Sequence, residues 1–330
     1  MSVSSVVTLS DRVAFIESVF GAGKLARNSL NIEVRCPICD PRDPTKKKLA
    51  IRTDDDRTHC WVCGYKSYTL APLIRKFSTQ AKMSEYRDRF MRKDLKNVRY
   101  DDVVTRAVEL PRDFRLLATA SDHDPDVVAT WRYAVTTRHM SDRDLWYFKA
   151  GVSDDPRWRR RIIVPSFDAE GNLNYFVARA IDSGRRPKYD NPDVNRLPIV
   201  FNELNVDWTK RLVLCEGAFD MFKCGDNAVP ILGSELDERY AVFNLVLVNN
   251  TPVALALDGD VWETKTPKIA KKLIEYGINV VLVDTRPFGD PGSASKEQFE
   301  EALDRAVEPT WSSMFNLKLS RASRTSLSIR

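Results

Sequence analysis

The strongest constraint on the fold is a pair of short apolar runs that each stop abruptly at acidic residues. Arg211-Leu-Val-Leu-Cys215 leads directly into Glu216-Gly217, and Val253-Ala-Leu-Ala-Leu257 leads into Asp258-Gly259-Asp260. Runs of this kind are typical of buried parallel strands, whose carboxyl ends meet at one edge of an open α/β sheet. Gathered carboxylates repel one another unless a cation neutralises them. Oxygen ligands without histidine suit Mg²⁺ or Mn²⁺, so the pattern predicts a divalent-ion site and metal-dependent phosphoryl chemistry.

The alternation of strand and helix continues through the rest of this region. It consists of a helix from Ala218, a helix over 267–276, a strand over 278–283 and a helical stretch over 296–302. Strands that alternate with helices form a parallel sheet covered by helices. The region after residue 210 is therefore predicted to be an α/β domain.

Two further elements are predicted upstream. Residues 160–181 should form a β-hairpin, because two strand-like stretches flank a turn ending in Gly171, which can adopt a positive φ. Near the amino terminus, apolar spacing predicts a short helix from Asp11 to Phe20, beginning after Ser10. Residues 78–110 are dense in charge and poor in large apolar side chains, which is typical of a mobile, partly helical linker.

Length and composition limit the class of protein. A chain of 330 residues is expected to contain two or three domains, and 43% hydrophobic with 29% charged residues fits folded, water-exposed domains. No apolar run approaches the ~20 residues of a membrane span. The first residues, Met-Ser-Val-Ser-Ser, lack the features of a signal peptide. We therefore expect a cytoplasmic protein.

The net positive charge is small, but the basic residues are concentrated in clusters. The formal net charge is +5, and three basic clusters stand out: Arg157, Arg159, Arg160 and Arg161; Arg185, Arg186 and Lys188; and Lys318, Arg321, Arg324 and Arg330. Such clusters suit a phosphate polymer, although each would equally fit a solvated surface.

Four of the six cysteines form two C-x2-C pairs. Cys36-Pro-Ile-Cys39 and Cys60-Trp-Val-Cys63 are separated by twenty residues, which is the spacing of a zinc ribbon with a tetrahedral shell of four thiolates. A complete shell predicts one structural zinc rather than a catalytic ion. His59 could replace one thiolate, but four well-spaced cysteines favour a supporting or nucleic-acid-contacting role for it. Trp61 and the basic residues nearby could stack on bases and neutralise phosphates, unless the ribbon serves only as a scaffold.

The order of these motifs resembles a known family. Glu216-Gly217-Ala-Phe-Asp220, Asp258-Gly259-Asp260 and Asp290-Pro291-Gly292 form a series similar to the TOPRIM domain. Together with the cysteine ribbon, the chain resembles the bacterial and phage DNA primases. The segments Arg161 to Gly171, Val177 to Asp182 and Pro187 to Asn191 are similar to the basic primase motif that precedes TOPRIM. The likeness spans about residues 30–70 and 110–305.

The resemblance implies a fold class and domain boundaries. The fold would be multidomain, with a small zinc-ribbon β domain followed by an α+β basic subdomain and an α/β TOPRIM domain with a parallel sheet. The implied boundaries are a ribbon domain at 1–75, a charged linker at 76–110, the basic part of the catalytic core at 111–208, TOPRIM at 209–305 and a basic tail at 306–330.

The resemblance also implies roles for individual residues. Glu216, Asp258 and Asp260 would hold two catalytic Mg²⁺ or Mn²⁺ ions, Asp290 would be a weaker fourth ligand, and Asp220 would be a supporting acid. Nucleic acid or nucleotide phosphates would be contacted by Arg161, Arg179, Lys188 and Trp61. Zinc would be held by Cys36, Cys39, Cys60 and Cys63, a four-cysteine set more like the phage form of the ribbon.

The implied activity is synthesis of short RNA primers on single-stranded DNA from ribonucleoside triphosphates. A replicative helicase would be a partner, since no fused helicase motor is recognised. Two alternatives stay open: a TOPRIM nuclease or topoisomerase-like enzyme, and a non-catalytic zinc-ribbon DNA-binding factor of recombination or replication. The sequence departs from the family after Asp260, where Val261-Trp-Glu-Thr-Lys265 replaces the usual small residues. We therefore expect the geometry of this loop to differ.

Overall fold

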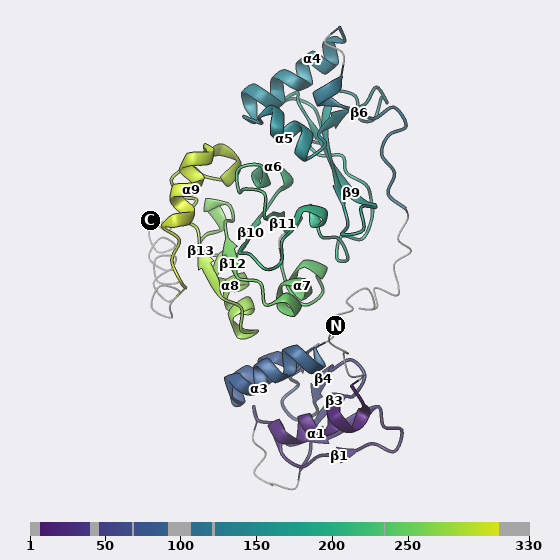
Figure 1. The fold of residues 1–330 in the computed structure, drawn as a ribbon, viewed down its shortest axis with the longest axis vertical. Helices are drawn as coiled ribbons and strands as arrows, with labels where there is room; N and C mark the ends of the chain where they lie inside the picture. Colours follow the sequence, from purple (N-terminus) through teal and green to yellow (C-terminus); the bar gives the residue numbers. More distant parts are fainter. Residues whose placement is uncertain are drawn as a thin grey trace, which may run out of the picture. The chain divides into compact units, whose positions relative to one another are not determined.

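The computed structural model describes residues 7–39, 46–67, 69–91, 107–120, 123–233 and 235–309. The chain divides into two compact units (Figure 1). One comprises Met1–Lys96 with Leu273–Gly277, and the other comprises Asn97–Lys272 with Ile278–Arg330. Among the described residues, no helix is both long enough and apolar enough to cross a membrane.

The first unit is built on a five-stranded antiparallel sheet. Its strands follow chain order: β1 (Lys24–Leu25), β2 (Asn31–Val34), β3 (Leu49–Arg52), β4 (Thr58–Cys60) and β5 (Lys66–Ser67). Alternate residues of β2 and β3 are fully buried and give the sheet one apolar face. Gly64, directly after the second cysteine pair, has φ +70° and donates its N–H to the carbonyl of Cys60 (3.0 Å), which closes the turn as its position predicts.

Helices pack on this unit and extend further along the chain than the sequence predicts. They are α1 (Leu9–Phe20), α2 (Ala71–Phe77), α3 (Gln80–Glu85) and a π-helical turn, Tyr86–Phe90. Phe15 stacks on Phe90 with ring centroids 4.4 Å apart, and Tyr86 is buried and donates to Asp56 Oδ2 (2.8 Å). Residues 80–91 are thus folded, whereas a linker was expected from residue 76. The sequence of this stretch contains many more charged residues than buried aromatic ones, so its composition resembles that of a linker. The expected linker over 92–106 lies outside the described residues.

The predicted amino-terminal helix exists, but it begins earlier than expected. Thr8, not Ser10, is its N-cap: the Thr8 hydroxyl accepts from the Asp11 N–H (3.1 Å), and the Asp11 carboxylate accepts from the Thr8 N–H (3.0 Å). This reciprocal capping box satisfies two N–H groups at once, which favours Thr8 over Ser10 as the starting point.

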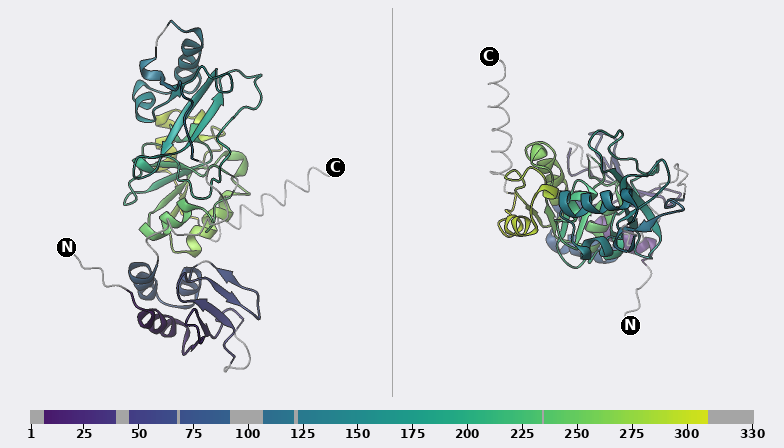
Figure 2. Two further views of the ribbon diagram at one scale, coloured as in Figure 1. Left: turned by 90° about the vertical axis from the view of Figure 1, so that its right-hand side faces the viewer. Right: turned by 90° about the horizontal axis from the view of Figure 1, so that it is seen from above.

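A four-stranded antiparallel sheet opens the second unit. Its order is β6 (Arg115–Leu116), β7 (Gly151–Val152), β8 (Arg161–Phe167) and β9 (Leu173–Ala180), with α4 (Pro125–Arg132) and α5 (Asp142–Tyr147) inserted between β6 and β7. Strands β8 and β9 form the predicted hairpin, the long pair of teal arrows in the left view of Figure 2. Its turn contains Gly171 at φ +86°, as expected.

A four-stranded parallel sheet completes the second unit. Its order is β11 (Ala228–Pro230), β10 (Leu212–Cys215), β12 (Val253–Leu255) and β13 (Val280–Leu282), and every neighbouring pair is parallel. In the register, Leu214 pairs with Leu255, and Leu255 with Leu282. Strands β10, β12 and β13 therefore end at the same edge of the sheet, and acidic residues follow each of them there. The predicted fold class, with a cysteine ribbon, an α+β segment and an α/β domain on a parallel sheet, is confirmed.

Helices cover this sheet (Figure 1). They are α6 (Ala218–Met221), α7 (Ala241–Asn249), α8 (Thr266–Glu275) and α9 (Lys296–Asp304). Val213, Ala254 and Val281 belong to one buried cluster with Phe219 of α6 and Phe299 of α9. The alternate strand residues, such as Leu214 and Leu255, are also fully buried, so the opposite face is covered as well. Burial on both faces explains why these strands read as continuous apolar runs.

Candidate functional site

The four cysteines bring their thiols together in one compact group. Their Sγ atoms all lie within 4.8 Å of one another, with Cys36 Sγ 3.9 Å from Cys63 Sγ and Cys39 Sγ 3.7 Å from Cys60 Sγ. Tetrahedral Zn–S bonds of about 2.3 Å place the sulfur atoms about 3.8 Å apart, whereas a disulfide brings them to about 2 Å. The separations therefore match a structural zinc site with four protein ligands. Within the described ranges, no other group of three or more metal-ligating side chains is this compact.

One face of the ribbon presents an exposed aromatic residue. The Trp61 side chain, in the turn between Cys60 and Cys63, is 68% exposed. The His59 ring lies 4.1 Å from the Trp61 ring, centroid to centroid, so the two rings form a joint surface. The four thiols complete the metal site without His59, as the spacing predicts.

The acidic residues gather at the carboxyl edge of the parallel sheet. Glu216 directly follows β10, and Asp258 lies three residues beyond β12. Asp220 is on α6, one turn after Glu216, and accepts a hydrogen bond from the Gly217 N–H (2.9 Å). Asp290 precedes the 3-10 turn Pro291–Ser293, in the loop that follows β13. The topology thus brings Glu216, Asp220, Asp258 and Asp290 together from three neighbouring strand ends, and the fifth predicted acid, Asp260, also acts electrostatically on Asp258.

Burial and mutual repulsion perturb these carboxyl groups. Burial, followed by the charges of Asp220, Glu216 and Asp290, raises the pKa of Asp258 to about 7. Burial also raises the pKa of Asp220 to about 6, and the nearby Asp290 and Glu216 charges add to this. Each shift is the electrostatic signature of several carboxylates that share one partly dehydrated space.

Two carboxylate oxygens at this edge are left without hydrogen-bond donors. Glu216 Oε1 and Asp258 Oδ1 are both buried and have no hydrogen-bond partner in the structure. A buried polar oxygen without a partner is costly, so such atoms are rare in folded proteins. Two such oxygens beside an acid with a raised pKa fit a cation ligand set made of hard oxygen donors.

Close backbone packing shapes the loop side of this acidic edge. A β-carbon placed on Gly292 would lie 2.7 Å from Asp220 Oδ1 and 3.1 Å from Asp290 Oδ1. Gly259, between Asp258 and Asp260, approaches the Arg286 backbone so closely that an added β-carbon would lie 3.0 Å from Arg286 Cα. The Gly259 N–H also donates to the Gly289 carbonyl (2.6 Å), which ties the two acidic loops together.

The loop after Asp260 does depart from a simple strand–turn–helix connection. Residues Gly259–Val261 form a 3-10 turn, and α8 begins only at Thr266. The bulky Trp262 side chain is packed inside the fold: it is 5% exposed, and the Arg286 guanidinium lies 5.0 Å from its ring centroid. Asp260 is exposed, whereas Asp258 is half-buried, so the two aspartates of the motif occupy different environments.

A cluster of arginine and aromatic side chains adjoins the acids. Arg179 Nε donates to the Tyr133 hydroxyl (2.8 Å), and Arg179 also donates to the Tyr189 hydroxyl. The guanidinium lies 5.2 Å from the ring centroids of both Tyr189 and Phe219. Phe219 immediately precedes Asp220, so Arg179 is held beside the acidic edge. Lys188 is exposed, and its ammonium lies 5.9 Å from the Tyr189 ring.

Arg161 does not lie where a direct phosphate contact requires. Its side chain is buried, and its guanidinium donates to the carbonyls of Pro187 (2.9 Å), Lys188 (3.3 Å) and Arg157 (3.4 Å). Burial lowers its pKa. The expectation of direct nucleic-acid contact by Arg161 is therefore not supported; this side chain instead positions the backbone that carries Lys188.

The other arginines of the same cluster are engaged with aspartates. Arg157 pairs with Asp190 (2.7 Å), Arg159 pairs with Asp126, and Arg160 bridges Asp126 (2.8 Å) and Asp182 (2.6 Å). Their positive charge is thus balanced within the fold, which the linear sequence could not reveal. The basic tail beyond residue 309 lies outside the described residues.

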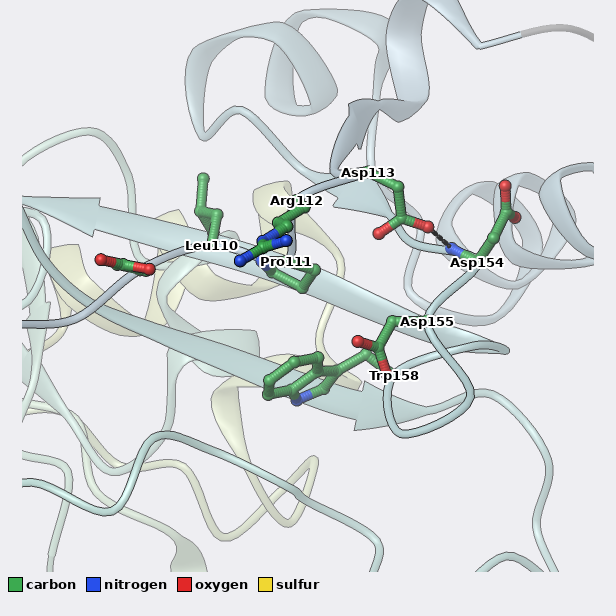
Figure 3. A pocket seen from close by; sticks show the side chains of 8 residues that line it. Leu110, Pro111, Arg112, Asp113, Asp154, Asp155 and Trp158 are labelled. Atoms are coloured by element: carbon green, nitrogen blue, oxygen red, sulfur yellow. Dashed lines mark hydrogen bonds between the residues drawn. The ribbon is translucent and has the colours of Figure 1, made fainter.

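A separate pocket of about 510 Å³ lies on the antiparallel part of the second unit (Figure 3). Two of its acids are already engaged: Asp113 accepts from the Ser153 hydroxyl (2.8 Å) and the Asp154 N–H (2.5 Å), and Asp154 pairs with Arg115 (2.5 Å). These interactions serve to hold the fold together at this pocket. The lining residues are Glu109, Leu110, Pro111, Arg112, Asp113, Asp154, Asp155 and Trp158, so none of the predicted site residues belongs to it.

Sequence reasoning missed one charged residue at the acidic edge. Lys265 Nζ lies 2.8 Å from Glu216 Oε2. Lys265 ends the segment 261–265, which departs from the family pattern, and this departure could have pointed to it. Tyr133 and Phe219, which hold Arg179, were also missed, because aromatic residues in mainly apolar segments are indistinguishable from core residues.

Comparisons with known proteins give a partial match. No protein-family model matches the sequence. A curated DNA primase of Mycoplasma pneumoniae (strain ATCC 29342 / M129 / Subtype 1) is 32% identical over 139 residues, which span 38% of this chain and 22% of that relative.

Two solved structures show more distant likeness. The crystal structure of the zinc-binding and RNA polymerase domains of the Aquifex aeolicus primase has a TM-score of 0.45 and 16% identity, covering 94% of this chain and 87% of that one. The E. coli primase catalytic core has a TM-score of 0.46 and 17% identity, covering 60% and 78%. Scores this low do not establish a common fold by themselves. The sequence match to the Mycoplasma relative confirms the resemblance to DNA primases that the motifs predict.

Proposed function

We propose that this chain is a DNA primase, a nucleotidyltransferase that builds short RNA primers on single-stranded DNA. The observation that carries the proposal is the carboxylate cluster of Glu216, Asp220, Asp258 and Asp290, with its two buried, unpartnered oxygens. The match to a relative named DNA primase supports the choice of reaction. The aligned segment spans only 22% of that relative, so the proposed activity rests on the acidic site of this chain.

Glu216, Asp258 and Asp260 would hold the divalent ions, with Asp290 as a further ligand. Bound there, Mg²⁺ or Mn²⁺ would neutralise the triphosphate and favour deprotonation of the attacking 3′-hydroxyl. In the reaction the 3′-oxygen forms a bond to the α-phosphorus, and the bond from that phosphorus to pyrophosphate breaks. Asp220 would orient the Glu216-Gly217 turn through its hydrogen bond to the Gly217 N–H (2.9 Å).

The positive side of the site would hold phosphates in line. Lys188 is exposed and free to reach a phosphate oxygen, whereas the Arg179 guanidinium is held against two aromatic rings beside α6. We assign direct contact with template, primer or nucleotide phosphates to Lys188 and to the remaining donor atoms of Arg179. Fixing a guanidinium in advance reduces the entropy lost when a phosphate binds.

The ribbon would help to bind the DNA template. The exposed Trp61 ring, supported by His59, is suited to stacking on an unpaired base. Ribonucleoside triphosphates would be the substrates, and a replicative helicase remains our proposed partner. Such an enzyme would act where the chromosome or phage genome is copied, in the bacterial cytoplasm.

Product identity tests this function. The protein would be incubated with single-stranded DNA of defined sequence, labelled ribonucleotides and Mg²⁺ or Mn²⁺, and the products separated by size and sequenced. We expect short RNA complementary to the template. Shortened DNA without RNA would instead indicate a nuclease or topoisomerase-like enzyme. Bound but unchanged DNA would indicate a non-catalytic binding factor.

A further inference from the structure

Lys265 lies inside the acidic edge of the parallel sheet. Its ammonium is 2.8 Å from Glu216 Oε2, and the side chains of Lys265 and Glu216 are only 16% and 21% exposed. This ion pair is therefore partly dehydrated, unlike most of the surface pairs of this chain. The Lys265 ammonium contacts Glu216 Oε2, while the other carboxylate oxygen of Glu216, Oε1, is buried and has no hydrogen-bond partner.

The backbone that carries Lys265 is held on several sides. The Lys265 N–H donates to the Val261 carbonyl (2.9 Å), and the Lys265 carbonyl accepts from the Ile269 N–H (3.1 Å) at the start of α8. Trp262, buried under the Arg286 guanidinium, anchors the middle of the loop. Lys265 therefore approaches Glu216 from a fixed base, and only its side chain needs to move.

The charges around Lys265 are predominantly negative. Glu216 approaches from the end of β10, and Asp258 and Asp260 precede Lys265 on its own loop. Asp220 on α6 and Asp290 beyond β13 also act electrostatically on Asp258. A single ammonium among five carboxylates reduces their repulsion but cannot neutralise it. A divalent ion would bring more charge and would require the same Glu216 oxygens.

We infer that Lys265 is an internal counter-ion that competes with the divalent ion for Glu216 and so sets how tightly that ion binds. The inference rests on the proposed function, because it assumes that the acidic edge holds the ion. When the ion binds, the Lys265–Glu216 pair has to open, and the ammonium stays nearby as a like charge. Both effects weaken ion binding relative to a chain without this lysine.

The competition has a defined direction that a purely structural ion pair does not share. If Lys265 served only to orient Glu216, its removal would weaken ion binding. If it competes, removal strengthens binding, since Glu216 is released and a positive charge is lost. When one charged group in a protein changes the affinity for a second bound group without excluding it, the change is typically about 5- to 150-fold.

Mn²⁺ titration by calorimetry, without DNA or nucleotide and with the zinc retained, measures this directly. We expect Lys265→Met to bind Mn²⁺ at least about fivefold more tightly than the wild-type chain. Lys268→Met, which removes an exposed ammonium from the first turn of α8, three residues after Lys265, should leave the affinity unchanged. Lys265→Gln removes the charge but keeps a polar side chain, and serves as the second variant should the methionine variant fold poorly.

The outcomes separate this inference from the proposed function. Asp258→Asn should weaken Mn²⁺ binding; if it does so while Lys265→Met and Lys265→Gln bind no more tightly than wild type, the counter-ion role is wrong and the ion site stands. If the wild-type chain binds no Mn²⁺ through Asp258, the ion site of the proposed function fails, and the role of Lys265 with it. Equal tightening by Lys268→Met would show only a general charge effect and would overturn the specific role.

Discussion

At the scale of single residues, the acidic edge depends on carboxyl groups that resist ionisation. The raised pKa values of Asp258 (about 7) and Asp220 (about 6) have the same causes, burial first and neighbouring acids second. In the folded chain these groups keep protons at pH values where the unfolded chain has lost them. The energy stored in their repulsion is available to a bound cation, which replaces the protons.

The first prediction follows from the sign of this shift. Because the pKa of Asp258 rises from 3.8 to about 7, the folded state binds more protons than the unfolded state between these values. The free energy of unfolding without divalent ion should therefore fall as pH rises through this window. Asp258→Asn should remove part of that fall, so it should stabilise the chain at pH 8 more than at pH 5.

Denaturant titrations at several pH values, in buffer without Mg²⁺ or Mn²⁺, provide the measurement. Asp304→Asn is a matched control, since this carboxylate is exposed at the end of α9. A stability difference between Asp258→Asn and wild type that is independent of pH would contradict the prediction.

The second prediction separates two basic residues of the same motif. Arg161→Met removes three charge-assisted bonds from a buried guanidinium to backbone carbonyls and should cost about 2–4 kcal/mol in the free energy of unfolding. Lys188→Met removes an exposed side chain and should leave stability nearly unchanged. It should instead weaken binding of single-stranded DNA and lower the salt dependence of log K by about one.

Chemical denaturation and DNA binding at several salt concentrations distinguish the two roles. If Arg161→Met were as stable as wild type but no longer bound DNA, Arg161 would be a direct DNA-contacting residue. That result would contradict the assignment of Arg161 to the support of the Lys188 backbone.

At the scale of elements, the loops that follow the strands shape the site as much as the strands do. Gly292 has no side chain where Asp220 and Asp290 converge. The third prediction is that Gly292→Ala pushes these carboxylates apart and weakens Mn²⁺ binding severalfold, because the new β-carbon would lie 2.7 Å from Asp220 Oδ1.

Gly184→Ala is the matched control, since nothing lies within 4 Å of an added β-carbon there. Calorimetric Mn²⁺ titration and circular dichroism of both variants would show whether ion binding changes without loss of fold. Unchanged ion affinity in a folded Gly292→Ala chain would mean that the Asp220–Asp290 approach is irrelevant to the site.

The elements with strong local patterns were predictable from sequence. The parallel strands over 212–215, 253–255 and 280–282, and the β8–β9 hairpin, follow from short apolar runs with clear ends. Helix α7 was missed, because its apolar residues are spread around the helix rather than gathered on one side. The sequence predicts a mobile, partly helical linker over 78–110, and its helices over 80–90 instead pack on the first unit. A few buried aromatic side chains, such as Tyr86 and Phe90, hold them there, and these are outnumbered in the sequence by charged residues.

At the scale of the whole molecule, the two candidate metal sites lie in different compact units and are expected to act independently. The first unit holds the four thiols, and the second holds the carboxylates. Residue types and their order along the chain could predict both sites. Contacts between residues far apart in sequence could not be predicted, which is why the Lys265–Glu216 pair and the aspartates that neutralise Arg157 to Arg160 were found only in the structure.

The fourth prediction concerns this independence. Cys39→Ser should lower the bound zinc from about one ion per chain and destabilise the first unit, because the tetrahedral shell loses one ligand. Mn²⁺ affinity at the carboxylates should be unchanged, while binding of single-stranded DNA weakens. Zinc analysis, Mn²⁺ calorimetry and limited proteolysis together test this; a parallel loss of Mn²⁺ binding would contradict it.

The central claim is that the carboxylate edge catalyses RNA synthesis on a DNA template. The most direct measurement is the rate of template-directed RNA synthesis at saturating DNA and Mg²⁺ for wild type, Asp258→Asn and the control Asp304→Asn. We predict that Asp258→Asn lowers the rate by at least about a hundredfold, as loss of a group acting on transition-state charge does, while DNA binding is retained and Asp304→Asn keeps the wild-type rate. RNA synthesis at the wild-type rate by a folded Asp258→Asn chain would contradict the account.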